Sequence, residues 1–356
     1  RGSLQWSIWI GFTVVLQKLL DIYLMSGVYG MKPKLLLNLG ISYAATSPLH
    51  YTLGWDNQYC HTGHCKEHQY LYILQKGIKS WGKKHPPKKN VKKDSRYTGT
   101  GCFEKYPPLT CESQILKGFD MDIIEQFFRC GRTTNIKSTC FCDKGGYSIE
   151  HYIDYYKELW RCVQGQFHAV ADFSNQGFLL DEQFMMSIRD RLLEEFDIKI
   201  TMLFRDPVRR LFSRTSKTSQ YFYDMTPLEY FKFHIEDHLD DNMHYAENYE
   251  KFVRVWGKDR VHPIVMEELW SDSQKVNDLA MFLEFPITKL HENCYYPDKG
   301  QNAPKYEYLS DQWCTNTVAL DKQTWEFGMA HLNWVYDNFE QTFGYIPSKW
   351  GVWYET

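Results

Sequence analysis

The chain has 356 residues, of which 43% are hydrophobic and 24% charged, values that are ordinary for a folded soluble protein. This length suits one large α/β domain or two modest ones. The formal net charge of -3 excludes a general affinity for polyanions, so we expect no nucleic-acid partner, and any basic site must be local. Aromatic residues reach 17%, and their rings can fill a core or line a groove for sugar rings.

The N-terminal segment carries an apolar run that is short for a membrane span. Residues 4–16 are apolar, but polar and charged residues interrupt the run before the ~20 residues that a spanning helix needs. We interpret residues 1–30 as a leader or an extension ahead of a domain at 31–356. The alternative is a membrane anchor within residues 4–25, and only in that case is a membrane expected as a partner.

From Lys34 onward, strand and helix signals alternate along the chain. Short apolar or β-branched runs predict strands, and apolar residues at helical spacing predict helices. The predicted strands are 34–39, 167–172, 198–204 and 261–266. The predicted helices are 148–163, 181–196, 207–217, 226–239, 246–256, a serine-capped helix at 271–284, and 318–342. This alternation predicts a single α/β domain in which helices flank a parallel sheet.

A basic, cysteine-containing insert interrupts the alternation at about 76–147. The stretch 76–96 holds nine Lys and Arg against one acidic residue, and five cysteines follow between Cys102 and Cys142. A charge run of this kind is by default a solvated loop. The functional alternative is that this basic stretch forms a binding surface for an acidic glycan.

The ten cysteines are compatible with several states, because their spacing fixes no disulfide connectivity. The sequence CHTGHC at 60–65, with His68 close behind, has zinc-ligand residue types, but its spacing matches no standard zinc knuckle. We predict no metal and leave disulfides or free thiols open. The chain has no Asn-x-Ser/Thr site, which favours a cytoplasmic location, and a Golgi-type lumen reached through an N-terminal anchor is the alternative.

Two predicted strands end in residues suited to binding an anion. In an open parallel sheet, ligands bind where the carboxyl ends of strands meet helix N-termini. After the first predicted strand, Gly40 leads through small residues to Ser47 and Pro48, which we interpret as a helix N-cap followed by proline at the first helical position. After the third predicted strand, Arg205 can offer a planar guanidinium to a phosphate, and Pro207 starts the next helix.

The motif R-D-P-x-x-R-x-x-S at 205–213 resembles the 3′-phosphate-binding motif of sulfotransferases that use 3′-phosphoadenosine 5′-phosphosulfate (PAPS). The similarity is greatest to the heparan-sulfate, or glycan, type. This resemblance implies a three-layer, P-loop-like α/β/α fold, PAPS as cofactor with PAP as its product, and no required metal. It implies that Arg205 and Ser213 hold the 3′-phosphate. The loop that it assigns to the 5′-phosphosulfate comprises Gly40, Tyr43, Ala44, Ala45, Thr46 and Ser47.

A second match lies at 66–72, which is similar to the second-strand segment of the same family. The resemblance makes Glu67 the candidate base for the acceptor proton, with His68 next in order. Lys66 is a candidate source of positive charge. A positioned base typically contributes about 10²–10⁴-fold to a rate.

Two later segments match in the same chain order. The segment 171–180 is similar to the acceptor-side segment of the family, which makes Ser174 a candidate for substrate binding. The segment 298–304 is similar to the loop that closes over the nucleotide. Its candidate cofactor contacts are Lys299, Gly300 and Gln301.

The sequence departs from the family where cations are expected. Tyr43 stands in place of the lysine or arginine of the 5′ loop, and Ala45 replaces a glycine. Phe173 stands where glycan sulfotransferases often carry a lysine, and Gln301 replaces the arginine of the late loop. One well-placed electrostatic donor can be worth ~10²–10³ in turnover, so Lys66 or Lys299 would have to supply charge from another direction.

The leading interpretation is a PAPS-dependent sulfotransferase that acts on a hydroxyl or amine, with a carbohydrate as the expected acceptor. A first alternative is a PAP- or glycan-binding protein of the same fold whose turnover was lost together with those cations. A second alternative is a different nucleotide-dependent transferase, although the chain has no Gly-Lys-Ser/Thr phosphate loop of the kinase type.

Overall fold

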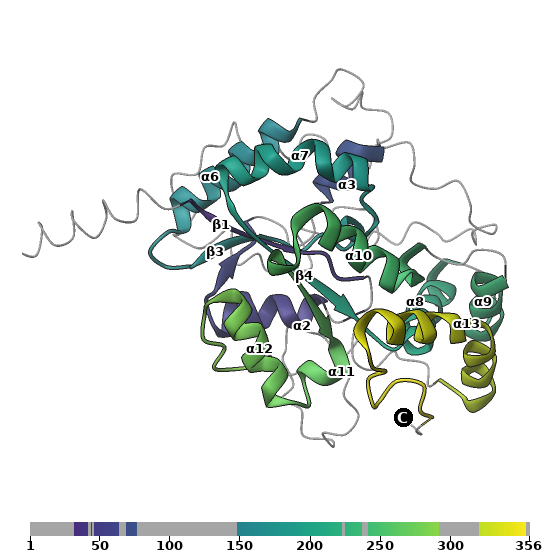
Figure 1. The fold of residues 1–356 in the computed structure, drawn as a ribbon. Coiled ribbons are helices and arrows are strands. Elements are labelled where there is room, and N and C mark those ends of the chain that lie inside the picture. The colour runs from purple at the N-terminus through teal and green to yellow at the C-terminus, as the bar shows by residue number, and fades with distance from the viewer. Residues whose placement is uncertain are drawn as a thin grey trace, which may run out of the picture.

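The computed structural model describes residues 32–41, 44, 46–63, 69–76, 148–222, 225–236, 241–291 and 320–353. Within them, a five-stranded sheet has the order β2-β3-β1-β4-β5, and every pair of neighbouring strands is parallel (Figure 1). The strands are β1 (Lys34–Asn38), β2 (Cys60–His61), β3 (Ala169–Asp172), β4 (Asp197–Phe204) and β5 (Val261–Val265).

Helices cover both faces of this sheet, which confirms the expected α/β/α layering (Figure 1). One face carries α3 (Tyr70–Lys76), α6 (Ile149–Val163), α7 (Glu182–Glu195) and α10 (Tyr245–Trp256). The other carries α2 (Thr46–Tyr51), which continues as a π-helical turn at Thr52–Asp56, and α12 (Ser273–Leu283). A third group packs together beyond the carboxyl end of β4 and consists of α8 (Pro207–Phe222), α9 (Pro227–Glu236) and α13 (Lys322–Phe343).

The core lies on both sides of the central strands. β1 and β3 are buried along almost their whole length, and so is the carboxyl half of β4. Strands of a parallel sheet covered on both faces read as continuous apolar runs rather than as alternating ones, which is why these three could be predicted from the sequence. The helix α6 then buries one face, from Tyr152 to Val163, against this sheet and is capped by Ser148, whose side chain accepts the His151 N–H.

Most of the predicted elements are confirmed within a few residues, and the differences have local causes. The prediction missed β2, because a strand of two residues has no periodicity to detect. It also missed the single turn α11 (Met266–Leu269) that follows β5. The serine cap predicted for α12 is wrong, since the Asp272 carboxylate accepts the Gln274 N–H at 2.8 Å and makes that residue the N-cap.

The second-strand interpretation of 66–72 is also wrong where the structure describes that segment. The second strand along the chain is β2, which ends at His61, and Tyr70 and Leu71 are instead buried residues of α3. Gln69 precedes this helix with a left-handed φ of 58°, a backbone conformation that breaks an extended segment. The expected leader and most of the expected insert lie outside the described residues.

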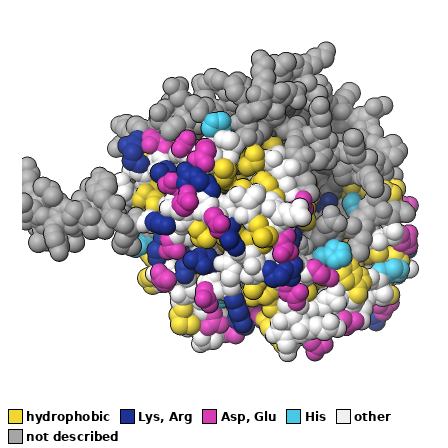
Figure 2. Space-filling model, turned by 45° about the horizontal axis from the view of Figure 1, so that its top comes forward, with side chains coloured by type: hydrophobic (Ala, Val, Ile, Leu, Met, Phe, Trp, Pro, Cys, Tyr) yellow, Lys and Arg dark blue, Asp and Glu magenta, His cyan; other side chains and the backbone are white. Residues whose placement is uncertain are grey.

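The surface of α6 and α7 carries charges of both signs in mutual contact. Arg191 pairs with Glu150 at 2.9 Å and with Glu195 at 2.6 Å, and Lys157 pairs with Glu195 at 2.7 Å. On the face shown in Figure 2, basic and acidic side chains are likewise interspersed. Among the described residues, no helix combines the length and apolar character needed to cross a membrane.

Candidate functional site

The carboxyl ends of β1 and β4 lie side by side, because the two strands are neighbours in the sheet. The chain leaves β1 through α2 on one face, and it leaves β4 for helices that end in α10 on the other face (Figure 1). In open α/β sheets, ligands bind where neighbouring strands connect to opposite faces. The sheet therefore brings together the two segments predicted separately as anion sites, the loop that starts at Gly40 and the turn at Arg205.

Gly40 allows the loop after β1 to lie directly against β4. The Gly40 N–H donates to Oδ1 of Asn38 at 3.0 Å, and the Ile41 N–H approaches the Leu203 carbonyl at 3.5 Å. A Cβ added at Gly40 would lie 2.6 Å from Cγ2 of Thr46 and 3.1 Å from Cβ of Leu203, closer than side chains normally approach. The space is therefore reserved for a residue without a side chain, and the loop backbone can come close to a ligand.

The helix after this loop begins earlier than predicted. α2 starts at Thr46, so Ser47 and Pro48 lie inside its first turn, and the predicted N-cap at Ser47 is wrong. Proline is tolerated there because the first N–H groups of a helix have no intrahelical partner. Ala44 and Thr46 are buried, whereas Tyr43 and Ala45 lie outside the described residues.

The turn at Arg205 is fixed mainly through its backbone. The Arg205 carbonyl accepts the Tyr245 hydroxyl at 3.0 Å, and the next N–H, of Asp206, donates to Oε1 of Glu267 at 3.0 Å. Asp206 caps α8, since its Oδ1 accepts the Arg209 N–H at 2.9 Å and Pro207 opens the helix. This arrangement holds the Arg205 side chain, which is half-buried, at the carboxyl edge of the sheet.

The other arginines of the motif divide between the interior and the edge. Arg210 is fully buried, with Nη1 2.8 Å from Sδ of Met243, and Arg209 is buried, with Nη2 donating to the Val352 carbonyl at 3.3 Å. Ser213 and Arg214, further along α8, are half-buried. Of the arginines between 205 and 214, therefore, only the half-buried Arg205 and Arg214 are accessible enough to contact a ligand.

Ser174 ties together two segments at the carboxyl end of β3. Its hydroxyl contacts Oδ1 of Asp172, and it accepts the Gln69 N–H at 2.7 Å. The Gln69 side chain continues the connection, donating to Oδ1 of Asn175 at 2.7 Å. The Tyr152 hydroxyl also donates to Asp172, at 3.0 Å, and burial together with this carboxylate raises the pKa of Tyr152.

This network was missed by sequence reasoning. Asp172 could have been noticed as the acidic end of the apolar strand FHAVAD, but nothing in the sequence links it to Gln69. The network anchors the chain two residues beyond Glu67. Ser174 therefore stabilises the fold at this point, in addition to the substrate-binding role that was predicted for it.

Two carboxylates lie behind the Arg205 turn, Asp206 and Glu267, both almost fully buried. Burial, and then the negative charge of Asp206, raise the pKa of Glu267, while the Trp350 Nε1–H that donates to its Oε2 at 2.9 Å acts in the opposite direction. Glu267 is a second functional candidate that sequence reasoning missed. Its signal was the pair of acidic residues, Glu267 and Glu268, that follows the strand VHPIV after a single methionine.

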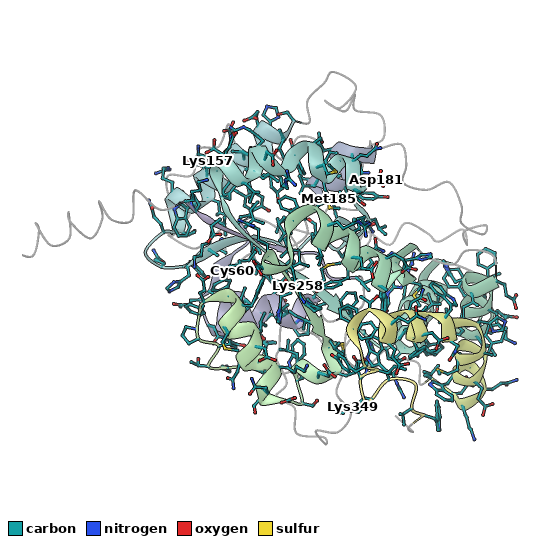
Figure 3. All side chains as sticks on the ribbon, in the orientation of Figure 1. Cys60, Lys157, Asp181, Met185, Lys258 and Lys349 are labelled. Carbon is teal, nitrogen blue, oxygen red and sulfur yellow. The ribbon has the colours of Figure 1, made fainter. Side chains whose placement is uncertain are left out.

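The described part of the chain contains no cluster of three or more His, Cys, Asp or Glu that could hold a metal ion. Cys60, at the centre of the view in Figure 3, is a buried free thiol whose pKa is raised by burial. Several predicted site residues lie outside the described residues, so their roles stay predictions. They are Lys66, Glu67, His68, Lys299, Gly300 and Gln301.

No family model and no curated protein sequence matches the chain. It is similar to a solved sulfotransferase from Alicyclobacillus acidocaldarius, with 16% identity over 90% of this chain and 98% of that one and a TM-score of 0.49. It is also similar to the sulfotransferase domain of the Synechococcus PCC 7002 olefin synthase, with 16% identity, coverage of 89% and 97%, and a TM-score of 0.39. For the sulfotransferase domain of the curacin pathway, these values are 14%, 85% and 98%, and 0.37.

Proposed function

We propose that the protein is a sulfotransferase that moves a sulfuryl group from PAPS to a hydroxyl or amine, with a carbohydrate as the expected acceptor. The observation that carries this proposal is the pairing of β1 with β4, which sets the Gly40 loop beside Arg205. PAPS has phosphate groups on both its 3′ and 5′ sides. A ligand with two separated anionic ends fits two anion-binding segments that meet at one edge of a sheet.

The residues present suit this nucleotide. The absence of a Cβ at Gly40 leaves the loop backbone compact against β4, and the Arg205 guanidinium can form paired hydrogen bonds with a phosphate. Arg205 and Ser213 would hold the 3′-phosphate, and residues 40–47 would hold the 5′ end. When bound, PAPS supplies the sulfuryl group and the phosphate that leaves.

The remaining chemistry falls to residues near the acceptor. Glu67 would accept the proton of the attacking hydroxyl, and Lys66 or Lys299 would stabilise the negative charge that develops on the leaving oxygen. The contacts of Gln69 with Ser174 and Asn175 hold the chain close to Glu67 at the carboxyl end of β3, the neighbour of β1. The base and the phosphate loop would thus lie near the carboxyl ends of two neighbouring strands, β3 and β1.

A catalytically weakened PAP- or glycan-binding protein is the second candidate, and the distribution of positive charge favours it. Tyr43 and Gln301 occupy positions where cations are expected. Arg209 and Arg210 do not replace those cations, because both are buried and contact Val352 and Met243. Such a protein would bind PAP without transferring sulfate.

The test is a calorimetric titration with PAP of the purified protein and of Arg205→Ala, followed by transfer assays with radiolabelled PAPS and a panel of glycans. We expect Arg205→Ala to weaken binding about 10- to 100-fold, since a charged hydrogen bond contributes about 1.5–3 kcal/mol. Arg254→Ala is the matched control, because that arginine pairs with Glu182 on the surface of α7 and α10. Absence of PAP binding to the folded wild-type protein would reject both the sulfotransferase and a PAP-binding protein, and binding without transfer would select the second candidate.

A further inference from the structure

The end of the chain reaches back to the Arg205 turn. After α13, the segment 344–353 folds beneath that helix, and Figure 3 labels Lys349 within it. Oδ2 of Asp206 accepts the Tyr336 hydroxyl at 3.0 Å and the Gly351 N–H at 2.9 Å. Trp350 donates from Nε1 to Oε2 of Glu267 at 2.9 Å.

These contacts act on the backbone of the proposed 3′-phosphate site. Glu267 uses one oxygen for Trp350 and the other for the Asp206 N–H, so it connects the chain end to the peptide that follows Arg205. Asp206 in turn uses Oδ2 to accept from Tyr336 of α13 and from Gly351, and Oδ1 to cap α8. Both acids are buried beside each other, and they stay in place because each accepts N–H or O–H donors.

We propose that Tyr336, Trp350 and Gly351 are positioning residues of the anion site: the end of the chain, through Asp206 and Glu267, sets the direction in which Arg205 presents its guanidinium. This inference rests on the proposed function for the identity of the ligand, but not for the positioning itself. Arg205 makes the contact with phosphate, and the three residues act through it. Because a guanidinium binds phosphate through paired hydrogen bonds, its affinity depends on angle as well as charge.

Trp350→Phe isolates this effect from packing. The Trp350 ring lies 4.5 Å from the ring of Phe339 and 6.1 Å from that of Tyr336, and phenylalanine retains much of this contact. What it removes is the N–H donor, leaving an oxygen of Glu267 buried next to Asp206 without that bond. Trp353→Phe is the matched control, because Trp353 lies three residues further on in the same segment and its ring packs against Trp325 at 6.0 Å.

The measurement compares the dissociation constants of PAP and adenosine 5′-monophosphate, which lacks the 3′-phosphate, for wild type, Trp350→Phe and Trp353→Phe. We expect Trp350→Phe to weaken PAP about tenfold, the effect of losing a charged hydrogen bond of about 1.4 kcal/mol, and to leave the monophosphate nearly unchanged. A general loss of folded protein would weaken both ligands together. Trp353→Phe should preserve the ratio of the two constants.

Amide hydrogen exchange tests the positioning without any ligand. In Trp350→Phe, the peptide that spans 203–210 should exchange faster than in wild type, while the peptide that contains β1 should not change. Unchanged exchange at 203–210 together with an unchanged ratio of ligand affinities would overturn the inference. If wild type shows no preference for PAP over the monophosphate, the proposed function fails, and hydrogen exchange alone then decides whether the chain end positions Arg205.

Discussion

Substituting alanine for Gly40 should test the loop after β1 more directly than any change of charge. The added methyl group would lie 2.6 Å from Cγ2 of Thr46, 3.1 Å from Cβ of Leu203 and 3.1 Å from Oδ1 of Asn38. Neither hydrocarbon neighbour can yield easily, because Thr46 is β-branched and sits in the first turn of α2, while Leu203 is fully buried in β4. The loop itself must therefore move away from β4.

The cost follows from this crowding. Overpacking a close-packed site by one methyl group typically costs about 1–3 kcal/mol, which for a chain of this size lowers the melting temperature by about 1–4 °C. PAP affinity should fall at least about tenfold, because displaced donors no longer meet the phosphate together. Differential scanning fluorimetry and calorimetric titration measure the two effects on the same sample.

A second substitution shows whether the clash is the cause. Thr46→Ser keeps the hydroxyl and removes the methyl group that the new alanine would meet, so Gly40→Ala/Thr46→Ser should recover a part of both losses, beyond additivity. Wild-type stability and affinity in Gly40→Ala would show that the loop is not packed as described. Failure of the double variant to recover would assign the loss to something other than the contact with Thr46.

Further predictions concern the neighbouring strand ends. Ser174→Ala should lower the free energy of unfolding by about 1–3 kcal/mol in urea titrations, because it removes the acceptor of the Gln69 N–H and one of the donors to Asp172; an unchanged midpoint would contradict that role. Since burial raises the pKa of Glu267, the folded state holds its proton more tightly than the unfolded state does. The free energy of unfolding should then fall as the pH rises from the ordinary pKa of a glutamate to the raised pKa of Glu267. Urea midpoints measured between about pH 4 and 8 should show this decrease in wild type and not in Glu267→Gln. Glu67→Gln should spare PAP binding and depress sulfate transfer, and unchanged transfer would remove Glu67 from the mechanism. Tyr43→Lys should raise transfer if the 5′ loop is a weakened sulfotransferase site, and no gain would count against that view.

The fold could be predicted from the sequence wherever one short stretch contained the whole signal. β1, β3 and β4 are continuous apolar runs, and α6 carries its buried residues at helical spacing, so each was recognisable without its neighbours. β2 was not recognisable, because its two residues form a strand only through pairing with β3. The same limit explains the early start of α2, where the helix begins at Thr46 before the residues that resemble a cap.

Single residues of the candidate site could be selected from the sequence, but the hydrogen bonds that connect distant residues could not. Gly40 and Arg205 could be selected because glycine and arginine at strand ends have a direct chemical meaning. Glu267 and Trp350 could not, because their importance arises from hydrogen bonds between residues 83 positions apart. Arg209 and Arg210 show the opposite error, since the sequence shows their charge but not their direction into the interior.

The buried acids also bear on how selective the site can be. In the proposed complex Arg205 would face a phosphate on one side, and it has Asp206 and Glu267 behind it, so part of its charge is already balanced in the free protein. A guanidinium so balanced attracts anions weakly at long range and discriminates among them by short, directional hydrogen bonds. A net charge of -3 acts in the same direction, because it opposes non-specific collection of polyanions. The strand-end geometry, rather than an accumulation of positive charge, is therefore what would let this site recognise one nucleotide phosphate.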